Sequence, residues 1–443
     1  MSDLPVIPFR RAVNAVARVP GSKSISNRAL ILALLSEKTV TLKNLLHSQD
    51  TEVMRNCFGE LGVSVTEPSK GTVVIEGGAE PVRSKEANLF VENAGTVARF
   101  LPAVLSLLPR GEFFFDGSDA MRERPMVGLL DSLQSLGSDV QFKGRSGFFP
   151  FILRANGWSK KTLVVDASQS SQILSALLLS GTRAPHSMRF ELSGETVSKP
   201  FVQMTLRMIQ QFGGRAVQDD NLFDVTPGLP GPEKEEYEIE PDATAASYFF
   251  ALPLAVGGTS QVHCIPEQSL QGDLEFLKVL ERIGFTVNRQ DQTVSTTLIG
   301  QPSASDSDFN AFSDTFLTLA ALAPLIEGTT RIRGISHTRH QETDRVSAMA
   351  NELRKLGQIV EEDMDSLTIT SDRSALTART KEAPLTVETY EDHRIAMSFA
   401  ILASHDLHGD GRPWISIHDP DCCRKTFPNF FDELARLRSI SNS

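Results

Sequence analysis

Basic side chains stand at the start of segments that are otherwise strongly apolar. In RVPGSKSISNRALILALLS, Lys23 and Arg28 open an apolar run, and in EDHRIAMSFAILASH the pair His393 and Arg394 does the same. Burying a charge on an apolar helix is costly unless the charge has a partner. A helix N-terminus also offers unpaired N–H groups and about half a positive charge, so phosphates and carboxylates bind there. The residue types and their placement therefore indicate binding of a small anionic ligand.

Six segments share this format of a polar head followed by a small-residue-rich apolar helix. They read SKSISNRALILALLS, NAGTVARFLPAVLSLLP, SQSSQILSALLLSG, DATAASYFFALPLAVGG, FSDTFLTLAALAPLIEG and EDHRIAMSFAILASH, and they recur about every 70 to 80 residues. Their heads carry Ser22, Lys23, Ser24, Arg28, Asn93, Thr96, Arg99, Ser170, Ser171, Gln172, His393 and Arg394. Ordinary N-capping is the alternative interpretation. Heads that face one another would form an electropositive pocket for a ligand with several negative charges.

Composition excludes several classes of function. The net charge of −11 over 443 residues argues against nonspecific nucleic-acid binding, which depends on Lys and Arg. The longest apolar runs are well short of the roughly 20 residues of a membrane-spanning helix, and the first twenty residues lack a signal-peptide pattern. Four cysteines without CxxC spacing indicate reduced structural thiols. We expect a cytoplasmic globular protein that binds neither nucleic acid nor membranes.

Nucleotide and metal motifs are absent from the sequence. GSKS around Lys23 lacks the spacing of a P-loop, and no GxGxxG follows a strand-like segment. HTRHQE could suggest metal ligands through His337, His340 and Glu342, but the spacing does not match HExxH. We expect no metal site.

A second, amphipathic helix recurs between the buried ones. It appears in MRNCFGELGVSV, LLDSLQSLGSDVQF, LRMIQQFGGRAVQ, LEFLKVLERIGFTV and MANELRKLGQIV, each with a Gly suited to a helix stop. Alternating segments such as TVVIEG, EFFFDG and SLTITS supply strands. The repeat predicts an α/β protein with six units in two domains of three. The stretch TPGLPGPEKEEYEIEPDA, residues 226–243, is the best candidate boundary.

These motifs together resemble the 5-enolpyruvylshikimate-3-phosphate synthase family. The matching landmarks, in order, are PGSKSISNRAL, NAGT, MRERP, SSQILSALL, SKPFVQMT, SYFFA, LQGD, ETDR, ELRKLG, DHRIAM and DPDCCRKTFP. The resemblance implies a two-domain enolpyruvyltransferase fold of six βαβαββ units, three per domain, with buried parallel helices and a ligand cleft between the domains. It further implies that residues 1–21 and 242–443 form one domain and residues 22–241 the other.

The resemblance also implies a reaction, without metal or organic cofactor. The enolpyruvyl group of phosphoenolpyruvate passes to the 5-hydroxyl of shikimate 3-phosphate, with release of phosphate, on the route to chorismate and the aromatic amino acids. The methylene carbon is protonated while the hydroxyl attacks C2, and the resulting ketal expels phosphate. Such chemistry needs a carboxylate acid/base pair and fixed cations. A monomer is the default expectation.

By motif match, the family's functional residues fall on positions of this chain. The phosphoenolpyruvate site comprises Lys23, Gly95, Arg124, Gln172, Arg345, Arg394 and Lys425. The shikimate 3-phosphate site comprises Lys23, Ser24, Arg28, Ser170, Ser171, Gln172, Ser198, Asp314, His337 and Gln341, with Arg28 suited to a bidentate carboxylate contact. Asp314 is the expected proton acceptor for the 5-hydroxyl. Glu342 is the expected proton donor to the methylene carbon, assisted by Lys23 or His393.

Four positions depart from the family pattern. Phe201 replaces the usual Tyr, which removes one hydroxyl contact to the substrate phosphate; His337 and Gln341 replace Asn and Lys. Phe100 stands where Pro is usual, so we expect reduced sensitivity to glyphosate, the inhibitor of the phosphoenolpyruvate site.

Three alternative functions follow from the sequence. An enolpyruvyltransferase with another acceptor fits the changes at Phe201, His337 and Gln341. A non-catalytic member would bind anions without turnover, but Lys23, Asp314 and Glu342 all remain in this chain and argue against it. The related UDP-N-acetylglucosamine enolpyruvyltransferase family uses a Cys in the loop that here reads GSDAMRERP, and that loop contains none.

Overall fold

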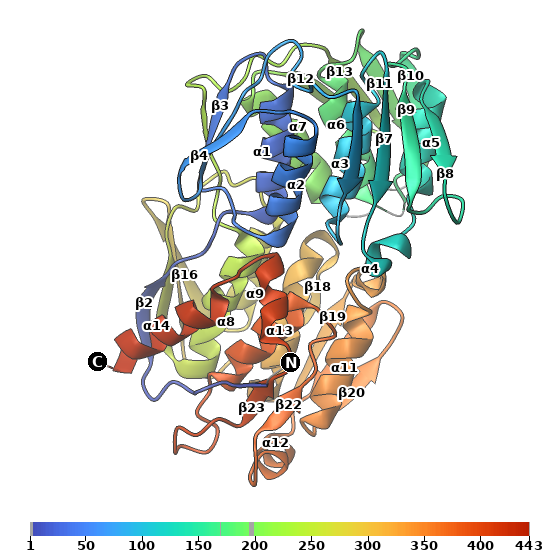
Figure 1. The fold of residues 1–443 in the computed structure, drawn as a ribbon. Coiled ribbons are helices and arrows are strands. Elements are labelled where there is room, and N and C mark those ends of the chain that lie inside the picture. Colours follow the sequence, from blue (N-terminus) through green and yellow to red (C-terminus); the bar gives the residue numbers. More distant parts are fainter. Residues whose placement is uncertain (1–2, 169, 195–198, 443) are drawn as a thin grey trace. The chain divides into compact units, whose positions relative to one another are not determined.

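The chain divides into two compact units (Figure 1). The computed structural model describes residues 3–168, 170–194 and 199–442. Unit 1 combines the chain up to Pro20 with the chain from Glu240 onward, and unit 2 runs from Gly21 to Ile239. The predicted boundaries after residues 21 and 241 differ from these by one and two residues. That each unit is an independently folding domain remains our proposal.

Three apolar helices form the centre of each unit. In unit 2 they are α1 (Lys23–Leu35), α3 (Gly95–Leu105) and α6 (Ser171–Gly181); in unit 1 they are α8 (Ala243–Val256), α10 (Phe316–Leu322) and α13 (His393–Ala403). Within each unit the three contact one another. Every residue of α3 and of α13 is buried, as a helix without a polar stripe requires. The prediction of buried helices with polar heads is confirmed.

The amphipathic helices also lie where the sequence places them. They are α2 (Gln49–Glu60), α5 (Val127–Leu136), α7 (Lys199–Gln211), α9 (Phe276–Arg282) and α11 (Arg345–Lys355). A glycine with positive φ follows each of them: Gly62, Gly137, Gly213, Gly284 and Gly357. Glycine takes this left-handed conformation without a Cβ clash, so each helix stops there and a strand begins.

The strands of the described residues form six sheets, three in each unit. Unit 2 holds β14 (Glu236–Glu238), β3 (Val40–Lys43), β5 (Thr72–Ile75) and β4 (Val65–Ser69); β6 (Glu86–Phe90), β7 (Gly111–Asp116), β9 (Phe151–Ala155) and β8 (Asp139–Phe142); and β10 (Thr162–Val165), β11 (Met188–Leu192), β13 (Leu222–Thr226) and β12 (Arg215–Asp219). Unit 1 holds β16 (Phe285–Gln290), β17 (Thr293–Leu298), β15 (Gly258–Val262) and β2 (Val13–Ala17); β18 (Asp306–Asp308), β19 (Thr329–Arg333), β21 (Ser366–Thr370) and β20 (Ile359–Glu362); and β1 (Leu4–Pro5), β23 (Ile415–Ile417) and β22 (Leu385–Val387). In each sheet a parallel pair continues into antiparallel pairing, which is the pattern of a βαβαββ unit.

Three sheets are completed by strands from distant parts of the chain. In unit 1, β1 pairs antiparallel with β23 and β2 pairs in parallel with β15; in unit 2, β14 pairs in parallel with β3. Gly21, at the start of unit 2, passes close to the chain that directly follows β3, because an added Cβ would clash with the carbonyl oxygen of Asn44. The glycine of PGSK is therefore a packing requirement.

The remaining helices complete the fold. They are α4 (Asp119–Arg122), α12 (Arg373–Arg379), α14 (Phe430–Asn442) and the 3-10 helices η1 (Gly272–Glu275), η2 (Asn310–Thr315), η3 (Ala323–Leu325), η4 (Ser336–His340) and η5 (Pro420–Lys425). No helix in the described ranges is long and apolar enough to cross a membrane.

Candidate active site

Arg345, the first residue of α11, is the centre of a charged cluster in unit 1. Its guanidinium donates from Nε to Asp392 Oδ2 at 2.7 Å, from Nη1 to Asp314 Oδ1 at 2.9 Å and from Nη2 to Glu342 Oε2 at 2.9 Å. Nη1 also donates to the amide oxygen of Gln341. The side chain is only 2% exposed. The fork of donors thus fixes three carboxylates from three separate segments.

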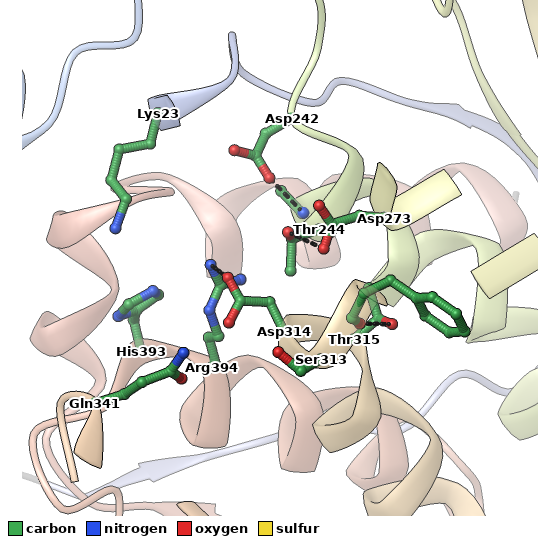
Figure 2. Close-up of polar contacts among 12 residues, drawn as sticks. Lys23, Asp242, Thr244, Asp273, Ser313, Asp314, Thr315, Gln341, His393 and Arg394 are labelled. Atoms are coloured by element: carbon green, nitrogen blue, oxygen red, sulfur yellow. Dashed lines mark hydrogen bonds and ion pairs between the residues drawn. The ribbon is translucent and has the colours of Figure 1, made fainter. Parts of the chain in front are cut away.

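Asp314 lies between two arginines. Its Oδ1 accepts from Arg345 at 2.9 Å. Its Oδ2 accepts from Arg394 Nη2 at 2.7 Å (Figure 2). Asp314 belongs to η2, just before α10 begins at Phe316, and Arg394 is the second residue of α13. The carboxylate remains 15% exposed, so it is held in place yet reachable.

Lys425 adds a third cation to this cluster. Its Nζ lies 3.1 Å from Glu342 Oε1, whose other oxygen accepts from Arg345. Burial disfavours the charged forms of Arg345 and Arg394, but neighbouring carboxylates outweigh it and raise the pKa of both. Three cations are thus balanced by three carboxylates. An anionic ligand that binds these cations must compete with the protein's own acids.

A further buried carboxyl, Asp273 in η1, lies beside this cluster. Thr244 Oγ1 donates to Asp273 Oδ1 at 3.1 Å (Figure 2). Burial raises the pKa of Asp273 to about 7; the negative charge of Asp314 acts in the same direction, and the positive charge of Arg394 opposes it. Asp273 therefore retains its proton to a much higher pH than an exposed aspartate does.

The two departures in HTRHQE both have protein partners in unit 1. The Nε2 atom of His337 lies 2.8 Å from Ser313 Oγ, next to Asp314, and burial lowers the pKa of His337. Gln341 uses its amide oxygen on Arg345. The change from a cation to a neutral amide at 341 thus gives Arg345 an acceptor where a lysine would repel it.

In unit 2, the head of α3 carries a packed arginine. Arg124 lies against Gly95, where an added Cβ would be 2.8 Å from Arg124 Nη2, and its Nη1 donates to Asn93 Oδ1 at 3.4 Å. Arg99 supports this segment from within, because its Nη1 donates to the carbonyl oxygen of Gly95 at 3.1 Å. Gly95 is therefore the residue that lets Arg124 approach the helix head.

The heads of α1 and α6 carry the other predicted groups of unit 2. Lys23 Nζ is 3.9 Å from Asp50 Oδ2 at the start of α2. Ser170 caps α6 by accepting from the backbone N–H of Gln172 at 3.3 Å, and Ser171 is buried beside it. Ser198, also predicted for this site, lies outside the described residues.

Arg28 of α1 is almost fully buried, with 1% of its surface exposed. It donates from Nε to Thr205 Oγ1 at 2.8 Å and from Nη1 to the carbonyl oxygen of Ser24 at 3.0 Å. Nη2 donates to Ser175 Oγ and to the carbonyl oxygen of Phe201, both at 3.3 Å. Burial lowers the pKa of Arg28 to about 9.

The structure thus gathers most predicted groups within each unit. Unit 1 brings together Asp314, Gln341, Glu342, Arg345, Arg394 and Lys425. His337 contacts Ser313, the residue before Asp314, and His393 is fully buried beside Asp392. Sequence reasoning missed three acids, Asp50, Asp273 and Asp392. Each of them lies at the start of a helix or directly before it, and this position is the feature of the sequence that could have indicated them. In the part of the chain that the structure describes, no group of three or more His, Cys, Asp or Glu residues could hold a metal ion.

Comparisons with known proteins agree on one family. The family profile described as EPSP synthase (3-phosphoshikimate 1-carboxyvinyltransferase) matches residues 9–434. Curated proteins named 3-phosphoshikimate 1-carboxyvinyltransferase include one from Opitutus terrae at 46% identity, covering 99% of this chain and 98% of that protein, and one from Nostoc punctiforme at 39% identity, covering 99% of each. A solved EPSP synthase from Acinetobacter baumannii superposes with a TM-score of 0.79 at 23% identity, covering 99% of this chain and 98% of the other.

Proposed function

This chain belongs to the EPSP synthase (3-phosphoshikimate 1-carboxyvinyltransferase) family, and from that premise we propose which groups carry its reaction. The protein transfers the enolpyruvyl group of phosphoenolpyruvate to the 5-hydroxyl of shikimate 3-phosphate and releases phosphate. One observation supports this assignment of catalytic roles: the carboxylate of Asp314 is partly exposed and is held by Arg345 and Arg394.

Asp314 accepts the proton of the 5-hydroxyl in this proposal. The two arginines fix the direction of its oxygens, which places a general base without the freedom of a surface side chain. Arg345, Arg394 and Lys425 of unit 1 act with Lys23, Arg124 and Gln172 of unit 2 on phosphoenolpyruvate, and Gly95 makes room for Arg124. Fixed cations favour the transition state because they meet the charge that develops on the departing phosphate.

Glu342 donates the proton that reaches the methylene carbon. Lys425, which is proposed to bind phosphoenolpyruvate, also pairs with Glu342, because its Nζ lies 3.1 Å from Glu342 Oε1. A phosphoenolpyruvate molecule that takes Lys425 leaves Glu342 with one cation fewer, which favours the protonated form of the carboxyl. Lys23 or His393 assists this transfer. Binding of phosphoenolpyruvate and protonation of Glu342 are then coupled.

The acceptor is bound mainly by unit 2. Ser24, Arg28, Ser170, Ser171 and Ser198 hold shikimate 3-phosphate, with His337 and Gln341 contributing from unit 1. A different acceptor is the second candidate, because Phe201 has no hydroxyl and the amide oxygen of Gln341 is already used by Arg345. We also propose that the protein acts in the cytoplasm as a monomer.

Phosphate release by the purified protein tests this assignment. With phosphoenolpyruvate and shikimate 3-phosphate, we expect rapid release that needs both substrates and no added metal. Shikimate, which lacks the phosphate, and UDP-N-acetylglucosamine serve as comparison acceptors. Release with another acceptor but not with shikimate 3-phosphate would support the second candidate and overturn the first.

A further inference from the structure

Arg28 is surrounded differently from Arg345, which is also a buried arginine of the proposed site. Arg345 is neutralised by three carboxylates, whereas within the described residues the hydrogen bonds of Arg28 all go to neutral hydroxyl and carbonyl oxygens. Two aromatic rings take the place of carboxylates. The guanidinium carbon of Arg28 lies 5.5 Å from the ring centroid of Phe100 and 5.8 Å from that of Phe201. Both distances are within the range of an attractive cation–π contact.

The two rings come from helices that pack against α1. Phe100 lies on α3 and is fully buried, and Phe201 lies on α7 and is half-buried. α1 contacts both of these helices. These are also the two positions where an aromatic ring without a hydroxyl departs from the residues usual in the family, Pro and Tyr.

Aromatic faces and carboxylates have different effects on a buried cation. A carboxylate stabilises the guanidinium but also neutralises it and competes with any anionic ligand. An aromatic face stabilises the cation through its quadrupole and leaves the net positive charge in place. A cation held in this way is ready for a ligand carboxylate.

The hydrogen bonds of Arg28 limit how that ligand can bind. Of the five N–H groups of a guanidinium, four donate to Thr205, Ser24, Ser175 and Phe201. Within the described residues this leaves one N–H, on Nη1. A bidentate contact, which the sequence led us to expect, would require Arg28 to give up a protein partner.

We propose that Phe100 and Phe201 are positioning residues that hold Arg28 so that it presents one charged N–H to the carboxylate of the acceptor. The inference rests on the proposed binding of shikimate 3-phosphate by Arg28. Phe100 is the sharper probe, because a fully buried ring cannot touch substrate itself. Its influence on the acceptor must pass through Arg28.

Calorimetric binding of shikimate 3-phosphate, without turnover, tests the proposal. Phe100→Leu should raise the Kd at least about fivefold, the scale of one cation–π contact. In phosphate-release assays the same variant should raise the KM for shikimate 3-phosphate while the KM for phosphoenolpyruvate stays within about twofold. Phe201→Leu should act likewise, whereas Phe201→Tyr, which keeps the ring, should bind shikimate 3-phosphate at least as tightly as the wild type.

Two controls separate positioning from a general loss of packing. Phe113→Leu changes a fully buried phenylalanine of β7 in the same unit, and it should leave acceptor binding unchanged. In an Arg28→Gln background, Phe100→Leu should have no further effect on the Kd. An unchanged Kd in Phe100→Leu, or an equal effect in the Arg28→Gln background, would overturn the proposal. Binding without turnover in the wild type would contradict the proposed function alone; no binding in the wild type would overturn both.

Discussion

Asp314 shows how the cluster makes one carboxylate both rigid and reachable. Each of its oxygens accepts from a different arginine, and those arginines begin two separate helices. Arg345 keeps contacts to Asp392 and Glu342 if Asp314 is lost, so the surrounding frame should survive its removal. This makes Asp314 a position where function can be tested apart from folding.

Asp314→Ala should therefore bind both substrates but turn over at least about 100-fold more slowly, the usual scale for a lost general base. Binding is measured by calorimetry and kcat by phosphate release. Asp306→Asn, which changes an exposed aspartate of β18 paired with Arg333, is the control and should keep kcat within about twofold. Near-normal turnover in Asp314→Ala would remove this residue from the role of base.

Gly95 carries a second prediction at this scale. In Gly95→Ala the new methyl group would lie 2.8 Å from Arg124 Nη2, and the flexible arginine must move away. Loss of one charged contact should raise the KM for phosphoenolpyruvate about 10-fold, with little change in the KM for shikimate 3-phosphate. Gly59→Ala is the matched control, because an added Cβ there meets nothing within 4 Å. Equal changes in both KM values would show that Arg124 does not act on phosphoenolpyruvate.

At the scale of elements, η1 and α8 meet at a carboxyl that should affect stability. Asp273 of η1 accepts from Thr244 of α8 and is 8% exposed, with its pKa raised to about 7. In the unfolded chain an aspartate ionises near pH 4. The folded state thus holds a proton that the unfolded state loses between about pH 4 and pH 7. The free energy of unfolding must fall over this interval as pH rises.

Asp273→Asn should reduce that fall, because the amide carries no titratable proton and still accepts from Thr244. Between pH 5 and pH 8 the variant should gain stability relative to the wild type, as measured by urea-induced unfolding. Asp306→Asn, an exposed aspartate, should show a constant difference over the same interval. A parallel pH dependence of Asp273→Asn and wild type would mean that Asp273 is already ionised at pH 5.

The elements themselves could be predicted from local sequence to a large extent. Buried helices, their polar heads and the glycine stops depend on composition and on residues a few positions apart, as in the run from Lys23 to Leu35. The partners of the heads could not be predicted this way. Asp392 and Asp50 neutralise cations only because the fold brings the start of α13 to the start of α11, and the start of α2 to the start of α1. Arg28 meets Phe100 and Phe201 for the same reason.

At the scale of the whole molecule, periodicity indicated six repeats but not where the chain crosses between units. The crossing depends on β2 and β14, short strands that pair with β15 and β3 far along the sequence. Only the family resemblance assigned the N-terminal segment to the C-terminal half. Asp314 also lies in the 3-10 helix η2, just before α10, and not in α10 itself.

The proposed domain division predicts that residues 21–239 fold alone. This segment contains three sheets and the three buried helices α1, α3 and α6. It should unfold in one cooperative transition in circular dichroism, and it should release no phosphate because it lacks Asp314 and Arg345. A segment that ends at residue 232 loses β14 and should be less stable. A 21–239 segment without a cooperative transition would contradict the division.

Proton nuclear magnetic resonance of the reaction in D2O tests the central claim most directly. Protonation of the methylene carbon makes a methyl group in the ketal, and loss of one of its hydrogens with phosphate restores the double bond. We predict an enol ether joined to the 5-position of shikimate 3-phosphate, with deuterium in its vinyl methylene group. Phosphate release that gives pyruvate without an enol ether, or no reaction of the two substrates, would contradict the account.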